Sequence, residues 1–173
     1  MAVRQPPGLD ALNAMAAPEA EDLLLRCCAS GRWAEEVAAG RPYVDEEALY
    51  AAADAALAGL GEADLDEALT GHPRIGEPPS GAGGSWSRRE QSRVTAAPDE
   101  TRAALAESNR AYEERFGHVY LVCATGMDAG ELLAVLRRRL RNDPATERRV
   151  LRAELGKINR LRLVRLVEDG AAA

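Results

Sequence analysis

The chain has 173 residues, a size at which a single domain can bury a substantial core. Its formal net charge is −6, and aromatic residues make up only 4% of it. The acidic balance argues against nucleic acids and anionic membranes as main partners, and the scarcity of aromatic rings argues against a base-stacking surface. No apolar run is long enough to span a bilayer, and the N-terminus lacks a secretory signal. We therefore expect a cytoplasmic protein without a membrane partner.

Three cysteines, Cys27, Cys28 and Cys123, do not make a disulfide framework, and we expect reduced, buried thiols. The sequence contains no CxxC, no HExxH and no close pair of histidines, so metal-ligand spacing is absent. The glycines of 81–84 follow prolines and lack the preceding strand and the Lys-Ser/Thr ending of a phosphate loop. We expect neither a metal nor another cofactor.

The first half of the chain shows helical patterns at 18–29, 32–37, 45–60 and 62–70. Asp45 is well placed as the N-cap of the third helix. Gly71 directly follows the fourth helix and is well placed as its C′ glycine.

The second half shows helical patterns at 87–97, 99–116, 128–141 and 144 to about 167. Gly117 would end the second of these, and Asp143 would cap the last. The uncharged run 119–124 could be a buried strand or an extended segment, and we favour the extended segment because no partner strand is visible. The fold class is therefore all-α. We expect a single domain (1–173) of about eight helices, with flexible tails at 1–8 and 169–173.

The sequence around Gly71-His72-Pro73 indicates a functional histidine. The residue before a proline is driven out of helical geometry, so His72 would stand on a stiff corner just after a helix. A loop rich in proline and glycine follows at 78–84. This setting favours a functional role for His72, whereas the other histidine, His118, lacks it and is interpreted as structural.

Glu90 has two interpretations. Ser87 and Glu90 have the spacing of a capping box, in which the glutamate binds the N-cap amide, and spacing alone favours this role. A glutamate at a helix start, close in sequence to a histidine corner, could also complete an acid/base pair. Gln91 by itself indicates little.

Arg162 lies in an apolar stripe of the last helix with Leu151, Leu155 and Ile158. An arginine in this position either extends toward water or binds an anion from within. Arg165 lies on nearly the same face, so both interpretations stay open. The run 137–139 is interpreted as a solvated basic face with one arginine turned inward.

Taken together, these motifs resemble the OHCU decarboxylase family (2-oxo-4-hydroxy-4-carboxy-5-ureidoimidazoline decarboxylase), which acts in urate breakdown. Each match is weak, but the ordered set is specific and extends over most of the chain. The matching residues are Trp33, 41–43, 72–76, 86–87, 90–91, Asn109, Tyr112, 116–117, 123–124, Gly126, 131–133, Arg139, Asn142, Ile158 and 162–163.

The resemblance implies an all-helical homodimer that uses no cofactor and converts a ureidoimidazoline substrate to (S)-allantoin and CO2. It implies catalytic roles for His72 and Glu90. The substrate-binding residues that it implies are Pro73, Ser87, Arg88, Arg89, Glu90, Gln91, Leu121, Val122, Cys123, Ala124, Thr125 and Arg162.

The chain departs from the family pattern in two places. Ser92-Arg93 stands where small residues are common, and the loop between Glu77 and Trp86 is unusually rich in glycine and proline. Both departures could alter the rim of a pocket. Two alternatives stay open: a related lyase or hydrolase acting on another ureido compound, and a non-catalytic helical interaction domain in which His72 forms only a turn and Glu90 only a cap.

Overall fold

The computed structural model describes residues 8–77, 88 and 90–168. These residues contain eight helices and no strand, which confirms the all-α prediction. They belong to two compact units, one made of residues 1–68 and 156–173 and the other of residues 69–155. The predicted tails, 1–8 and 169–173, lie outside the described residues except for Gly8, the N-cap of the first helix. No helix within the described ranges is long and apolar enough to cross a membrane.

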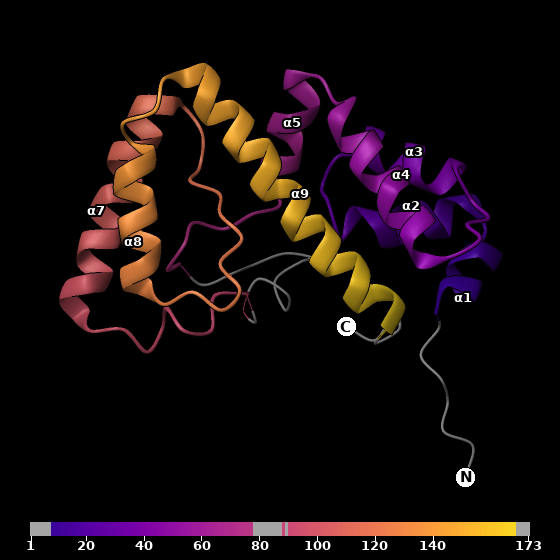
Figure 1. The fold of residues 1–173 in the computed structure, drawn as a ribbon, viewed down its shortest axis with the longest axis horizontal. Helices are drawn as coiled ribbons and strands as arrows, with labels where there is room; N and C mark the ends of the chain where they lie inside the picture. Colours follow the sequence, from indigo (N-terminus) through magenta and orange to yellow (C-terminus); the bar gives the residue numbers. More distant parts are fainter. Residues whose placement is uncertain (1–7, 78–87, 89, 169–173) are drawn as a thin grey trace, which may run out of the picture. The chain divides into compact units, whose positions relative to one another are not determined.

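The first unit is built from short helices. They are α1 (Leu9–Ala14), α2 (Ala17–Leu25), α3 (Gly31–Ala39), α4 (Glu46–Ala58), α5 (Glu62–Leu69) and the C-terminal part of α9 (Pro144–Glu168). Helix α2 packs on α3, and α3 packs on α4 (Figure 1). The fully buried Trp33 joins the last two, because its indole N–H donates to the carbonyl of Ala53 at 3.0 Å.

The local signals in this unit explain where its helices begin and end. Asp45 accepts the N–H of Ala48 at 2.8 Å, so its predicted role as an N-cap is confirmed. The helix predicted at 18–29 ends earlier, at Leu25, because Ser30 is in extended geometry and its hydroxyl caps α3. The sequence analysis did not identify α1.

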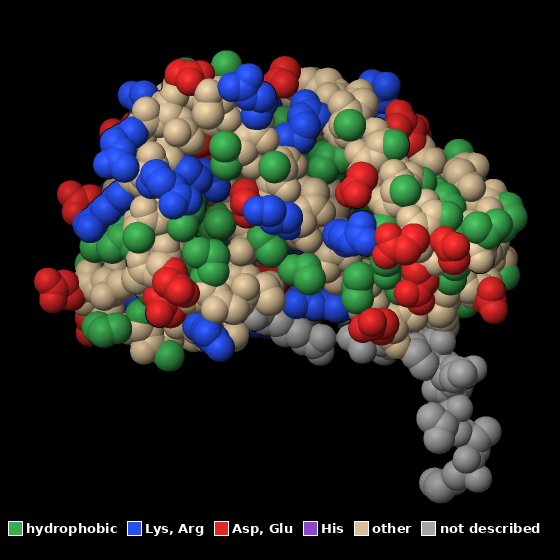
Figure 2. All heavy atoms as spheres, viewed as in Figure 1, with side chains coloured by type: hydrophobic (Ala, Val, Ile, Leu, Met, Phe, Trp, Pro, Cys, Tyr) green, Lys and Arg blue, Asp and Glu red, His purple; other side chains and the backbone are tan. Residues whose placement is uncertain are grey.

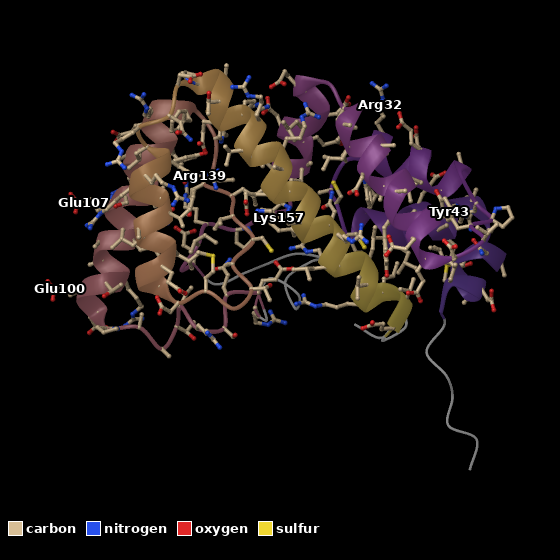
Figure 3. The ribbon with its side chains drawn as sticks, in the orientation of Figure 1. Arg32, Tyr43, Glu100, Glu107, Arg139 and Lys157 are labelled. Carbon is tan, nitrogen blue, oxygen red and sulfur yellow. The ribbon has the colours of Figure 1, made fainter. Side chains whose placement is uncertain are left out.

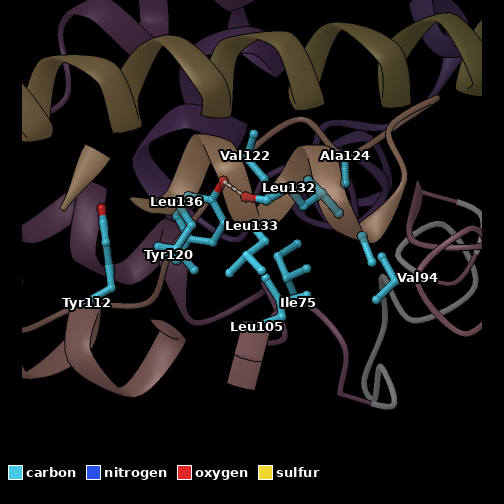
Figure 4. Close-up of a cluster of buried hydrophobic side chains, with 11 residues drawn as sticks. Ile75, Val94, Leu105, Tyr112, Tyr120, Val122, Ala124, Leu132, Leu133 and Leu136 are labelled. Carbon is cyan, nitrogen blue, oxygen red and sulfur yellow. Dashed lines mark hydrogen bonds between the residues drawn. The ribbon is translucent and has the colours of Figure 1, made fainter. Parts of the chain in front are cut away.

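The second unit contains α7 (Asp99–Phe116), α8 (Ala129–Arg139) and the N-terminal part of α9. Helices α7 and α8 lie side by side (Figure 1). Between them, 119–124 forms no helix or strand, in agreement with the favoured extended segment. One cluster of buried side chains fills the unit (Figure 4): Ile75, Val94, Leu105, Tyr112, Tyr120, Val122, Ala124, Ala129, Leu132, Leu133 and Leu136.

The two caps predicted in the second unit, Gly117 and Asp143, are both present, and α8 has a further cap that was not predicted. Gly117 ends α7 with a φ of 76°, and its N–H donates to the carbonyl of Glu113 at 2.8 Å. Asp128 and Glu131 form a capping box at the start of α8. Asp143 accepts the N–H of Thr146 at 2.9 Å at the start of α9.

Two local predictions are wrong. Gly71 does not have the left-handed geometry of a C′ glycine; in this region Gly76 has it, with a φ of 92°. The helix predicted at 87–97 does not continue through its described second half, where 91–96 form turns. Val94 donates to the carbonyl of Gln91 at 3.0 Å, and the hydroxyl of Thr95 donates to the carbonyl of Ser92 at 3.1 Å. Such side-chain bonds and β-branched residues compete with helix formation.

The basic run at the end of α8 divides as predicted. Arg137 and Arg138 are exposed, and basic side chains gather over α8 and the beginning of α9 on the face shown in Figure 2. Arg139 is turned inward and is only 3% exposed (Figure 3).

We predict that Gly117→Ala lowers the free energy of unfolding by about 1 kcal/mol. No atom lies close to the position of the added Cβ, so the cost comes from the left-handed backbone alone. Gly31→Ala is the matched control, because it is equally uncrowded but lies within α3, where alanine favours the helix. Urea unfolding measures both variants; equal effects would contradict the prediction.

Candidate active site

The predicted histidine corner lies in the second unit. His72 is buried, with 8% of its surface exposed. Its backbone N–H donates to the carbonyl of Leu69 at 3.1 Å. Pro73 is half-buried. The imidazole is therefore largely shielded from water rather than displayed on the surface, and such an environment strengthens its interactions with a bound molecule.

Hydrogen bonds and an ion pair attach this corner to α7. Both oxygens of the Glu113 carboxylate accept from the Arg74 guanidinium, one of them at 2.9 Å. The Asn109 side-chain amide donates to the carbonyl of Ile75 at 3.0 Å, and the Ile75 side chain enters the buried cluster. The residues immediately after His72 are thus fixed to a rigid helix, which limits where the imidazole can lie.

The corner also contacts the segment that follows the 78–87 loop. The N–H of Gly76 donates to the Oε1 of Gln91 at 2.9 Å, and Gln91 is buried. The two residues are fifteen positions apart, so this bond joins the histidine corner to the residue directly after Glu90. Gln91, which indicated little in the sequence, has a defined role in the structure.

A second long-range bond reaches the turn that follows the extended segment. Arg93 donates from Nη1 to the carbonyl of Gly126 at 2.9 Å. Ile75, Val94 and Val122 enter the same buried cluster (Figure 4). Segments that contain or directly follow predicted site residues, 72–76, 90–94 and 121–125, thus contribute side chains to one core. One of the departures from the family pattern, Arg93, supplies one of the connections.

Charged side chains hold the backbone of the extended segment. The carbonyl of Leu121 accepts from Arg139 at 2.6 Å, and the N–H of Cys123 donates to the Glu154 carboxylate at 2.8 Å. The side chains of Leu121, Val122 and Ala124 are buried, that of Cys123 is half-buried and that of Thr125 is exposed. Within the described ranges, the peptide N–H and C=O of Val122 have no hydrogen-bond partner.

The remaining predicted residues before Gln91 are only partly described. Glu90 is half-buried in a helical position, and Arg88 is exposed. Ser87 and Arg89 lie outside the described residues, so the predicted capping box of Ser87 and Glu90 lies outside them too.

Arg162 belongs to the first unit. It is 2% exposed, and its Nη1 donates to the carbonyl of Cys27 at 3.3 Å, just after α2. Cys27 and Cys28 are buried as predicted, and burial raises the pKa of the Cys27 thiol to about 12 and that of the Cys28 thiol to about 11. Cys123 is half-buried, so the expectation of buried thiols is wrong for this residue.

The sequence analysis did not assign a role to Glu154 in the site. Its position beside the apolar stripe of Leu151, Leu155 and Ile158 could have suggested a carboxylate directed toward the protein interior. The described residues contain no group of three or more His, Cys, Asp or Glu side chains that could hold a metal ion.

A cavity of about 320 Å³ lies beside the corner. Its walls include Ile75, Gly76, Val94, Leu105 and Asn109. None of the predicted catalytic or substrate-binding residues that the structure describes lines it.

Sequence comparison places the chain among known proteins. The sequence profile described as OHCU decarboxylase matches residues 13–164. The uric acid degradation bifunctional protein TTL of Arabidopsis thaliana is 34% identical over 162 residues, which cover 91% of this chain and 50% of that protein. The OHCU decarboxylase of Amia calva is 31% identical over 139 residues, which cover 78% of this chain and 79% of that enzyme. The chain thus spans about half the length of the plant protein.

Solved structures give the same result. A crystal structure of OHCU decarboxylase in the presence of (S)-allantoin matches with a TM-score of 0.74 and 32% identity, covering 84% of this chain and 97% of that chain. A crystal structure of (S)-allantoin synthase matches with a TM-score of 0.68 and 20% identity, covering 91% of this chain and 53% of that chain. The second match shows the shared fold alone.

We predict that Gln91→Leu lowers the free energy of unfolding by about 1–2 kcal/mol, because the N–H of Gly76 loses its acceptor in a partly buried place. Ser92→Ala, an exposed neighbour in the same turn, is the control and is expected to change stability by less than about 0.5 kcal/mol. Thermal and urea unfolding report both. A Gln91→Leu variant as stable as the control would mean that this bond does not hold the corner.

Proposed function

Because this chain belongs to the OHCU decarboxylase family, we propose that it decarboxylates 2-oxo-4-hydroxy-4-carboxy-5-ureidoimidazoline to (S)-allantoin and CO2, without a cofactor. The observation that supports this most strongly is the hydrogen bond from Gly76 to Gln91, since it joins the His72 corner to the segment that carries Glu90. His72 and Glu90 belong to the same compact unit as the extended segment.

The substrate itself explains why so few catalytic groups are needed. Its carboxylate is attached to the carbon that bears the hydroxyl group, next to a C=N bond. When the C–C bond to the carboxylate breaks, its electron pair forms a C=C bond and the imine pair moves to nitrogen, which takes up a proton. The substrate therefore supplies the electron sink that a cofactor supplies in other decarboxylases.

We assign the remaining proton transfers to His72. The imidazole would accept the hydroxyl proton and deliver a proton to the former imine carbon, acting first as a base and then as an acid. Delivery to one face of that carbon would give a single enantiomer of allantoin. Burial of His72 supports this assignment, because a shielded imidazole exchanges its proton with the substrate rather than with bulk water.

Glu90 and the extended segment would orient the substrate. A half-buried carboxylate at Glu90 can accept hydrogen bonds from ring or ureido N–H groups and favour the protonated form of a neighbouring imidazole. The peptide groups of Val122, which have no partner in the described part of the chain, offer one donor and one acceptor, which match the C=O and N–H of a ureide. We keep Pro73, Gln91 and the rest of 121–125 as substrate-binding residues in this proposal.

Arg162 stays a prediction of the family resemblance. A buried guanidinium can bind a carboxylate through two parallel hydrogen bonds, which supports the assignment, whereas its bond to the carbonyl of Cys27 supports a structural role. The substrate-binding roles of Ser87, Arg88 and Arg89 also rest on the resemblance.

We predict that His72→Gln lowers kcat/KM for the decarboxylation by at least about 100-fold, because general acid–base catalysis contributes that much or more. Glu90→Gln is expected to lower kcat/KM as well, because a neutral amide accepts hydrogen bonds from the substrate N–H groups more weakly than a carboxylate does. The substrate is generated from urate by urate oxidase and hydroxyisourate hydrolase, and circular dichroism follows the formation of optically active allantoin. The wild-type protein is expected to accelerate the signal; a non-catalytic domain would leave the spontaneous, racemic decay unchanged.

His118→Gln is the matched control, since it removes the other histidine. His118 stacks on Phe116 and contacts the Tyr112 ring edge-on, so this change is expected to affect stability but to leave the rate near that of the wild type. If His72→Gln formed (S)-allantoin at the wild-type rate, the assignment of His72 would be wrong. Faster turnover of another ureido compound would favour the alternative of a related lyase or hydrolase.

We further propose that the chain acts as a homodimer in the cytoplasm and that its two units work as one domain, as the family resemblance implies. Sedimentation equilibrium is expected to give twice the mass of one chain at micromolar concentration. A monomer that retains full decarboxylase activity would contradict the dimer proposal without affecting the proposed reaction.

A further inference from the structure

A buried carboxylate lies at the centre of the second unit. Glu147 is fully buried at the start of α9, and three side chains donate hydrogen bonds to it. The hydroxyl of Tyr112 and the Nε of Arg139 donate to Oε1, the latter at 2.8 Å, and the amide of Asn142 donates to Oε2 at 2.8 Å. Donors on both oxygens offset the cost of removing a charge from water.

Arg139 connects this carboxylate to the extended segment. One side of its guanidinium binds Glu147, and Nη1 on the other side donates to the carbonyl of Leu121 at 2.6 Å. The guanidinium also lies 4.9 Å from the centre of the Tyr120 ring, which favours a cation over its face. The planar fork of arginine makes both sets of contacts at once, which the single ammonium group of lysine cannot do.

A second anchor lies two residues further along. The Glu154 carboxylate accepts the N–H of Cys123 at 2.8 Å. In extended backbone the peptide groups of successive residues point to opposite edges, so those of Leu121 and Cys123 point to one edge and those of Val122 to the other. Arg139 and Glu154 therefore hold one edge, and the peptide groups of Val122 belong to the edge without partners among the described residues.

We propose that Arg139, fixed by Glu147, and Glu154 are positioning residues that orient the peptide N–H and C=O of Val122 toward the ureido group of the substrate. This inference rests on the proposed function. Neither side chain takes part in the proton transfers. Their charged groups form hydrogen bonds with the backbone of 121–123, and this backbone in turn binds the substrate. A peptide group held in place binds a ureide without losing freedom on binding, which lowers KM.

A positioning role and a purely structural role of Arg139 and Glu154 affect different measured quantities. If these residues only stabilised the fold, their replacement would lower the melting temperature but leave KM, kcat and enantiomeric purity unchanged in the protein that remains folded. A displaced Val122 peptide would instead raise KM more than it lowers kcat. It would also reduce the enantiomeric excess, because a loosely held ring presents both faces to the proton donor.

Arg139→Lys in the full-length chain is the first test. We expect KM to rise about tenfold, the effect of losing one charge-assisted hydrogen bond, with a smaller fall in kcat and a measurable loss of enantiomeric excess. Arg138→Lys is the matched control, since it makes the same exchange at the exposed neighbouring position of α8 and is expected to keep wild-type kinetics. Far-UV circular dichroism and a melting curve establish that each variant is folded.

Glu154 provides a second test that does not disturb the buried ion pair. Glu154→Leu removes the acceptor for the N–H of Cys123 and is expected to raise KM in the same direction as Arg139→Lys. Glu154→Gln keeps an oxygen acceptor and is expected to restore most of the wild-type KM. This pair decides the proposal if Arg139→Lys does not fold.

The outcomes separate this proposal from the proposed function. Wild-type protein that does not accelerate the decarboxylation would overturn the proposed function, and this inference with it. Active wild-type protein together with Arg139→Lys and Glu154→Leu variants of unchanged KM and enantiomeric excess would overturn only the positioning role. A raised KM in both variants, with rescue by Glu154→Gln, supports it.

Discussion

The buried ion pair of Glu147 and Arg139 is the interaction on which the second unit depends. Two charges removed from water are tolerated only when almost every donor and acceptor is matched. Here Tyr112 and Asn142 donate further hydrogen bonds to the Glu147 carboxylate, and the carbonyl of Leu121 accepts a hydrogen bond from the Arg139 guanidinium. The pair therefore fixes α7, α8, the start of α9 and the extended segment to one another, and loss of either charge would leave the other buried without its partner.

The candidate site is made of the irregular backbone in an otherwise helical unit. Within a helix all peptide N–H and C=O groups except those of the end turns bond to each other, so an all-α protein offers peptide groups to a ligand at helix ends and where the chain is not helical. The corner after His72, the turns at 91–96 and the segment 119–124 are such places. They meet on one apolar cluster and are joined by bonds from Gly76 to Gln91 and from Arg93 to Gly126. A reaction in which the substrate carries its own electron sink suits a site of this kind.

Most of the helical framework could be predicted from sequence because its signals act over a few residues. The apolar pattern of 99–116, the left-handed Gly117 after it and the cap at Asp143 are signals that each act over about one turn of helix. The same short range explains one of the errors. The turns at 91–96 contain a competing bond from the Thr95 hydroxyl to the carbonyl of Ser92, which periodicity does not register. Nothing in the structure explains why Gly71 lacks left-handed geometry.

The sequence by itself therefore determined the all-α class, the extended nature of 119–124, the inward arginine among 137–139 and, through an ordered set of weak motifs, the family. Only the tertiary structure decided which residues meet. Gln91 accepts a hydrogen bond from Gly76, fifteen positions earlier, and Glu154 accepts one from Cys123, thirty-one positions earlier. Such partners depend on how the chain returns on itself around a shared core, and no local pattern of charge or hydrophobicity specifies them.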